Sequence, residues 1–297
     1  MKNTKNYIPQ LLIIYLLWGF NWVVIRTANN YFPPILFVAL RFTIGAVALL
    51  ILCAFRHKLL PPKEYLPWIA ITGLLTMAIN NVMVQFATVP LGSGMTSVID
   101  YTMPLWTTLI AAVVLGEKLT LRKLGGTIIA IIGLAVLMNV SIQGNFKWVL
   151  ITIGAAVIWA VSNILVKAKL KGCDMIQYTA WQMVFAAIAL DIFVTVVPQG
   201  DVDWQPMAWG TLLYNGLLAS AVAFYIWNFV LSNMEAGKAS VAMMAVPAVG
   251  VLCGIIFLHE PMTLSRAIGM IAIILGIIIV LTGKDSGGKA PRKGDKG

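Results

Sequence analysis

Ten long apolar stretches dominate the chain, and short polar segments separate them. A helix needs roughly 17–25 apolar residues to cross a bilayer, and each stretch has about that length. The sequence therefore predicts an all-α polytopic membrane protein with ten transmembrane helices. We place these helices near residues 9–27, 34–54, 66–87, 94–115, 122–139, 147–167, 175–197, 206–231, 239–258 and 265–283.

The pattern of the first half recurs in the second half. With a shift of 143 residues, Pro104 falls on Pro247 and Glu117 falls on Glu260. Such duplication in a membrane chain is typical of transporters. Each copy holds five predicted helices, and an odd number reverses the direction of the second copy, so we expect two inverted five-helix repeats. The predicted segments are a cytoplasmic N-terminus (1–8), a first repeat (9–139), a linker (140–146), a second repeat (147–283) and a disordered basic cytoplasmic tail (284–297).

Composition and charge agree with a membrane protein whose two termini are cytoplasmic. Apolar residues make up 60% of the chain and charged residues only 11%, whereas soluble domains average about 25% charged residues. Of the 21 Lys and Arg residues, 17 fall on the side that holds the N-terminus, which the positive-inside rule assigns to the cytoplasm. The net charge of +10 is then a topology signal with contacts to anionic lipid, so no nucleic-acid partner is expected.

Several short motifs occur in an order that resembles a known family. They are Leu17-Trp18-Gly19-Phe20-Asn21, Ala39-Leu40-Arg41-Phe42, Tyr101-x-x-Pro104 followed by Leu115-Gly116-Glu117-Lys118-Leu119-Thr120, and Pro247 followed by His259-Glu260-Pro261-Met262-Thr263. Together they resemble the EamA branch of the drug/metabolite transporter superfamily, from about residue 9 to residue 283. The resemblance implies a central cavity, a bacterial-type inner membrane, and movement of small metabolites or drugs, often outward.

Polar and aromatic residues inside the predicted helices are candidates for the substrate pathway, because polar groups in a bilayer are costly and usually functional. Pro104 and Pro247 interrupt equivalent helices, which points to a binding site, although a static kink that improves packing is the alternative. The candidates are Trp18, Asn21, Asn80, Asn81, Gln85, Tyr101, Pro104, Trp159, Ser162, Asn163, Tyr225, Asn228, Met244 and Pro247. Tryptophans near helix ends are expected to be interfacial anchors, and these are Trp22, Trp68, Trp148, Trp204 and Trp209.

Arg41 and Asp100 are charges at equal predicted depth, and their equivalents in the second copy, Gln182 and Met243, are neutral. One interpretation is a structural salt bridge between them. The other is a functional pair, in which Asp100 exchanges a coupling proton with the outside. Arg41 then either shifts the pKa of Asp100 or binds a substrate carboxylate. The sequence alone leaves both interpretations open.

Glu117 and Glu260 lie at equivalent helix ends on opposite sides of the membrane. We expect them to cap helices or to pair locally with Arg122 or Arg266, as structural residues. Glycines seven residues apart in the fifth and tenth helices should allow close helix contact as scaffold, with an oligomer interface as a further option. These are Gly126, Gly133, Gly269 and Gly276.

Catalytic and metal-binding patterns are missing from the sequence, so we expect neither an enzyme nor a cofactor. The histidines have no metal-ligand spacing, and no nucleotide-binding loop occurs, so a gradient must drive transport. Export of small amphipathic metabolites such as amino acids is the leading hypothesis. The alternatives are multidrug export, metabolite uptake and, last, a sensor that transports nothing. The substrate, the coupling ion, the direction of flux and the oligomeric state stay open.

Overall fold

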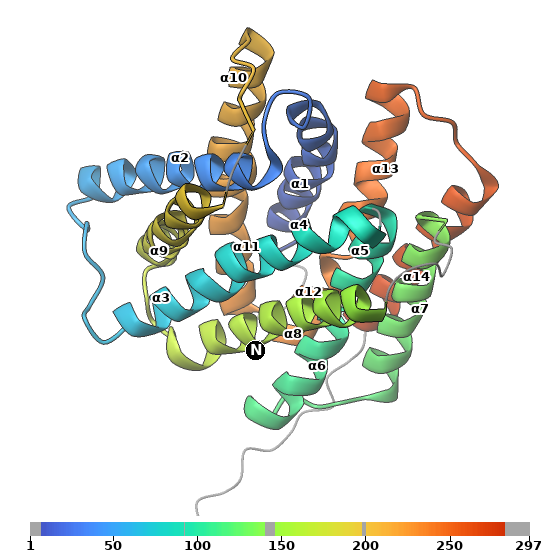
Figure 1. Cartoon of the computed structure of the whole chain (residues 1–297). Coiled ribbons are helices and arrows are strands. Elements are labelled where there is room, and N and C mark those ends of the chain that lie inside the picture. The colour runs from blue at the N-terminus through green and yellow to red at the C-terminus, as the bar shows by residue number, and fades with distance from the viewer. Residues whose placement is uncertain (1–6, 92, 140–145, 198–199, 283–297) are drawn as a thin grey trace, which may run out of the picture.

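The computed structural model describes residues 7–91, 93–139, 146–197 and 200–282 of the 297-residue chain. The regular structure of these residues is helical (Figure 1). The predicted basic tail (284–297) and most of the predicted N-terminal segment and linker lie outside the described residues. In order, the elements are α1 (Ile8–Ala28), α2 (Pro34–Phe55), α3 (Leu66–Gly73), η2 (Leu74–Ile79), α4 (Asn80–Leu91), α5 (Ser93–Asp100), α6 (Met103–Val114), α7 (Leu121–Leu137), α8 (Phe146–Lys169), α9 (Met175–Val196), α10 (Pro206–Leu213), η3 (Tyr214–Val222), α11 (Ala223–Asn233), α12 (Ala236–Ala242), α13 (Ala245–Leu258) and α14 (Leu264–Leu281).

The ten predicted spans each correspond to one helix or to a run of consecutive helices. Within the described ranges, nine of these units have at least 18 residues and are apolar enough to cross a membrane. The tenth is α7, which is apolar but has 17 residues. The Thr120 side chain caps the start of α7, and the Thr263 side chain caps the start of α14 in the same way at the equivalent position.

Four spans are interrupted within the membrane region. The spans formed by α3, η2 and α4 and by α10, η3 and α11 each contain a π-helical segment. The spans formed by α5 and α6 and by α12 and α13 break just before Pro104 and Pro247. Because proline has no N–H to donate and its ring clashes with the preceding turn, the chain restarts as a new helix there. The predicted kinks are therefore helix breaks.

Helices α7 and α14 lie side by side over most of their length (Figure 1). A Cβ atom added at Gly126 would lie 2.8 Å from the Gly276 carbonyl oxygen, and one at Gly133 would lie 2.9 Å from the Gly269 carbonyl oxygen. Only glycine permits such a close backbone approach. The predicted glycine faces thus pack against each other inside the chain.

The other extensive helix pairs are α2 with α9 and α1 with α13. Each of these pairs joins a helix of the first repeat to a helix of the second. We call the end of the bundle at which α1 begins and α2 ends the near end, and the opposite end the far end. The sequence predicts that the near end is cytoplasmic.

Candidate functional site

A cavity of about 170 Å³ lies among helices from both halves of the chain. We call it the central cavity. Its walls combine opposite charges, amides and aromatic rings, which is unusual for a membrane interior. The lining residues are Trp18, Asn21, Trp22 and Ile25 from α1, Arg41 from α2, Thr76 from η2, Asn80, Asn81 and Val84 from α4, Asp100 and Tyr101 at the α5–α6 break, Trp159 from α8, Phe224 from α11 and Val246 from α13.

Arg41 provides the positive charge of the central cavity. Its side chain is buried, and it donates hydrogen bonds to the Asn215 side-chain oxygen at 3.1 Å and to the Asn81 side-chain oxygen at 2.9 Å. Its Cζ atom lies 4.4 Å from the centroid of the Phe42 ring, in a cation–π arrangement. Both hydrogen-bond partners are neutral amides, which orient the guanidinium without cancelling its charge.

Asp100 provides the negative charge, but it does not form a salt bridge with Arg41 in this structure. One carboxylate oxygen of Asp100 accepts from the Asn80 side chain at 3.2 Å, and Asn80 also donates to the Ala155 carbonyl at 3.0 Å. The direct salt bridge offered as one interpretation of the sequence is therefore wrong for this conformation. Equal depth along the membrane does not fix lateral distance, and asparagine side chains bind each charge instead. Both charges nevertheless line the same cavity.

The helix interruptions shape this cavity. Thr76 belongs to the π-helical segment η2, and the Asn81 side chain donates to its carbonyl at 3.1 Å. In the second half, Asn215 of η3 donates to the Asn21 side-chain oxygen at 2.7 Å while it accepts from Arg41. Because a π-helix places one extra residue in a turn, it redirects side chains and carbonyls locally, and such segments are frequent at functional sites.

Aromatic rings of α1 and α11 form part of the cavity wall. The Trp18 indole N–H donates to the Ala219 carbonyl of η3 at 2.7 Å, and the Trp18 and Phe224 rings meet edge to face at 5.0 Å. This hydrogen bond and ring contact join α1 of the first half to the η3–α11 span of the second half. The aromatic wall is therefore built across the two halves of the chain.

The structure places the predicted pathway residues in three groups. The first group lines the central cavity and contains Trp18, Asn21, Asn80, Asn81, Tyr101 and Trp159, together with Arg41 and Asp100. Tyr225 lines a second, larger cavity instead. The third group lines neither cavity and contains Gln85, Pro104, Ser162, Asn163, Asn228, Met244 and Pro247.

Buried polar residues of the third group bind neighbouring helices. The Asn228 side chain donates to the Thr179 hydroxyl at 3.0 Å and to the Gln182 side-chain oxygen at 3.1 Å. The Ser162 hydroxyl donates to the Thr72 carbonyl at 3.3 Å. Such hydrogen bonds between membrane helices satisfy polar groups structurally, and sequence spacing alone does not distinguish them from pore lining.

Several lining residues were not predicted from the sequence. Trp22 was expected to anchor the chain at the membrane interface but lines the cavity, and Ile25, Thr76, Val84, Phe224 and Val246 were not singled out. Asn215, which binds Arg41, is also a missed residue. An asparagine within the apolar run of the eighth span was a usable signal, because polar residues in a membrane helix usually have a specific role.

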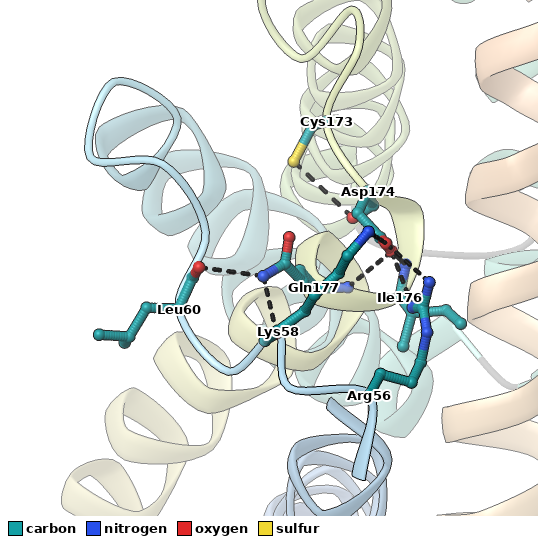
Figure 2. A network of polar contacts seen from close by, with 7 residues as sticks. All are labelled: Arg56, Lys58, Leu60, Cys173, Asp174, Ile176 and Gln177. Carbon is teal, nitrogen blue, oxygen red and sulfur yellow. Dashed lines mark hydrogen bonds and ion pairs between the residues drawn. The ribbon is translucent and has the colours of Figure 1, made fainter. Parts of the chain in front are cut away.

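The second cavity lies at the near end and has a volume of about 650 Å³. We call it the near-end cavity. Figure 2 shows the polar network on one of its walls, where Asp174 caps the start of α9. The Asp174 carboxylate accepts from Arg56 at 3.0 and 3.2 Å and from the backbone N–H of Ile176 at 2.9 Å. Gln177 donates to the carbonyls of the α2–α3 loop at 2.7 and 3.0 Å, which ties that loop to α9.

The electrostatics of this network are those of a stable ion pair. Partial burial disfavours the Asp174 carboxylate, but the hydrogen bonds from Arg56, Ile176 and Gln177 outweigh burial and lower the Asp174 pKa below its usual value. Burial and the adjacent Asp174 charge raise the pKa of the Cys173 thiol to about 11. Cys173 is therefore a neutral thiol and not a reactive thiolate at physiological pH.

Glu117 and Glu260 have different partners despite their equivalent positions. Glu117 accepts from the backbone N–H groups of Ala236 at 2.6 Å and Gly237 at 3.2 Å, and so caps α12 from the other half of the chain. Glu260 forms ion pairs with Arg26 and, at 3.0 Å, with Arg266. The Glu260–Arg266 pair is one that was expected from the sequence. Glu117 binds α12 instead of Arg122, which donates to the Ile279 carbonyl and the Thr282 hydroxyl.

Comparisons with known proteins agree with this architecture. The sequence pattern of the EamA-like transporter family matches residues 6–139 and again residues 146–282. The chain belongs to this family. A chain of known crystal structure superposes on this EamA protein with a TM-score of 0.81 at 18% identity, over 94% of this chain and 96% of that chain, which shows a shared fold.

Relatives of this EamA protein include named exporters. The Bacillus subtilis protein called "Uncharacterized transporter YoaV" is 34% identical over 91% of this chain and 94% of its own length. A Salmonella typhimurium protein named a probable amino-acid metabolite efflux pump is 24% identical over 92% of this chain and 93% of its own length. A Streptantibioticus cattleyicolor protein named a probable terminal-alkyne amino-acid exporter is 25% identical over 81% of each chain. The EamA protein is thus a multi-pass membrane transporter.

Proposed function

We propose that this protein is a gradient-driven exporter of small amphipathic metabolites, with amino acids as its leading substrates. Its membership of the EamA-like family supports transport, and the names of two relatives favour amino-acid export. The near end is then cytoplasmic, as the distribution of Lys and Arg predicts.

The observation that carries this proposal is the pair of opposite charges in one small cavity. Placing a charged residue at the centre of a membrane helix costs about 2.5–3.5 kcal/mol on insertion scales. Arg41 and Asp100 are both buried, and in the described ranges neither forms an ion pair. Such an arrangement fits a small solute that carries both charges and an apolar group, as an amino acid does. A sugar phosphate would require more than one cationic residue in the pathway.

Alternating access is the transport mode that fits the duplicated chain. Two repeats of opposite orientation can exchange conformations, so that a site between them opens first to one side and then to the other. The unequal partners of Glu117 and Glu260 fit a state in which the two ends of the protein differ. In the opposite state we expect the two glutamates to exchange their kinds of partner.

Asp100 is the candidate for proton coupling. A carboxylate that binds either a proton or the ammonium group of the substrate, but not both, links proton entry to substrate exit. Asn80 supplies the only side-chain hydrogen bond to Asp100 within the described residues, and this leaves its second oxygen open to such an exchange.

Transport by purified protein in proteoliposomes tests the proposal. The twenty common L-amino acids and a set of lipophilic cations are assayed as competitors of counterflow, with and without a pH gradient. We expect competition by neutral amino acids and acceleration by the gradient, and Asp100→Asn should abolish the acceleration. Competition by cations alone would favour the multidrug alternative, and the absence of any solute movement would contradict the proposal.

A suitable control is Asp191→Asn. Asp191 is also an acidic residue of a membrane helix, but it accepts from Thr43 at 3.2 Å and does not line the central cavity. If Asp100→Asn and Asp191→Asn had equal effects on the pH response, the proposed role of Asp100 would be wrong. Normal, proton-dependent transport by Asp100→Asn would lead to the same conclusion.

A further inference from the structure

Three residues that line the central cavity each carry a side-chain donor that has no hydrogen-bond acceptor among the described residues. These donors are the Arg41 Nε–H, the Thr76 hydroxyl and the Trp159 indole N–H. Arg41 and Thr76 are each more than nine-tenths buried, and the nitrogen and oxygen atoms concerned expose almost no surface in this conformation. A buried donor without a partner costs about 1–3 kcal/mol, so three of them at one cavity require an explanation.

The chemistry of this set is one-sided. An arginine Nε–H and an indole N–H can only donate, and the threonine hydroxyl can donate as well as accept. Arg41 adds a positive charge that its partners, the neutral amides of Asn81 and Asn215, do not cancel. The group that satisfies all three donors and the charge together is an anion with several acceptor lone pairs. A carboxylate has this form, with two oxygens and about four lone-pair positions.

A second charged residue in the cavity lining selects the remainder of the ligand. Asp100 also lines the cavity, and the only hydrogen bond to its carboxylate among the described residues comes from Asn80. A simple anion would leave the Asp100 charge unbalanced, and a simple cation would leave the Arg41 charge unbalanced. A solute with a carboxylate and an ammonium group balances both.

We propose that Arg41, Thr76 and Trp159 turn these donors toward the cavity when substrate binds and form a carboxylate subsite, so that the transporter requires substrates with a free carboxyl group beside a free amino group. This inference rests on the proposed function, because it assigns the substrate orientation within the same cavity. It adds a prediction about esters, amides and amines: compounds without a free carboxylate are poor ligands even where their apolar part is identical.

Binding to the purified full-length protein tests the subsite. The twenty common L-amino acids are screened by isothermal titration calorimetry, and the tightest binder is compared with its carboxamide and with the amine that lacks the carboxyl group. Loss of a hydrogen bond to a charged group weakens binding by about tenfold to a hundredfold. We therefore expect the carboxamide and the amine to bind at least about tenfold more weakly than the acid.

Two conservative variants locate the effect. Trp159→Phe and Thr76→Val each remove one donor and retain most of the side-chain volume. Each should weaken binding of the amino acid by about tenfold and leave binding of the matching amine unchanged. The matched control is Trp106→Phe, because the Trp106 indole N–H donates to the Thr102 hydroxyl at 3.1 Å and Trp106 does not line the central cavity. It should alter neither affinity.

The outcomes separate the subsite from the proposed function. If the acid and its carboxamide bind equally well, or if both variants weaken the acid and the amine to the same extent, the subsite is wrong while amino-acid export stands. If no amino acid binds and a lipophilic cation does, both the subsite and the amino-acid form of the proposed function are wrong.

Discussion

Glu117 and Glu260 occupy equivalent positions in the two repeats, so the same Glu→Ala substitution can be compared at both. We expect different losses of unfolding free energy at the two positions. Glu117→Ala removes the acceptor of two backbone N–H groups, at 2.6 Å from Ala236 and 3.2 Å from Gly237. Both of these residues are buried, so their N–H groups would lose their partner where water has little access. Each unsatisfied buried N–H costs about 1–3 kcal/mol, and partial hydration should reduce the sum for the pair to about 2–4 kcal/mol.

Glu260→Ala is the matched control at the other end of the bundle. It removes ion pairs with Arg26 and Arg266, and the Arg26 side chain is 67% exposed. Ion pairs in contact with solvent contribute about 0–1 kcal/mol each, and water can reach both Arg26 and the 25% exposed Arg266 side chain without Glu260. We therefore expect the two alanine variants to differ by about 2–3 kcal/mol, with Glu117→Ala the less stable protein.

The free energy of unfolding, measured by denaturation in mixed detergent micelles, tests this difference. Glu117→Gln is a useful intermediate, because its amide oxygen keeps one acceptor and it should lose about half of the Glu117→Ala effect. Equal destabilisation by Glu117→Ala and Glu260→Ala would refute the argument. It would mean that the hydrogen bonds to α12 contribute no more than an exposed ion pair.

Three further predictions concern stability and use the same measurement. Gly126→Ala should destabilise the protein by about 1–3 kcal/mol, because the new methyl group would clash with the backbone of α14. The control Gly125→Ala has open space around the added atom and should be neutral or stabilising by up to about 1 kcal/mol. Equal effects of the two substitutions would contradict the close helix packing. Asp174→Asn should destabilise the protein at pH 7, and its difference in unfolding free energy from the wild type should shrink as the pH falls below about 4. The lowered Asp174 pKa gives stability that is present above the unfolded-state pKa and is lost when the folded carboxylate is protonated. A pH-independent difference would contradict this prediction. His259→Gly should stabilise the protein by up to about 1 kcal/mol, because His259 has a positive φ of 54° at the position equivalent to Gly116; a loss of stability would contradict it.

The sequence predicted the spans well because each depends on local composition. Ten apolar runs became ten helical units, and the predicted breaks at Pro104 and Pro247 lie where α6 and α13 begin. The π-helical segments were not predictable in the same way. Residues such as those of Leu74–Ile79 favour an ordinary α-helix equally well, and the extra residue per turn depends on packing against other helices.

The candidate site was predictable in its residue types more than in its contacts. Burial of polar groups in a membrane identified Arg41, Asp100, Asn80 and Asn81, which all line the central cavity. The same rule selected Asn228, whose hydrogen bonds serve helix packing. Depth along a helix can be read from the sequence, but rotation of the helix about its axis is set by its neighbours.

The two repeats preserve backbone features but not the charges of the site. Arg41 is equivalent to Gln182, which accepts a hydrogen bond from Asn228 within a buried packing cluster, and Asp100 is equivalent to Met243. Both charges therefore come from one repeat, while the second supplies Trp159, Phe224, Val246 and the Asn215 side chain that binds Arg41. The second repeat therefore has no equivalent site that carries the two charges. If access alternates, the helices around the cavity must open it in turn to each side, and the unequal glutamate contacts at the two ends are where that change should be measured first.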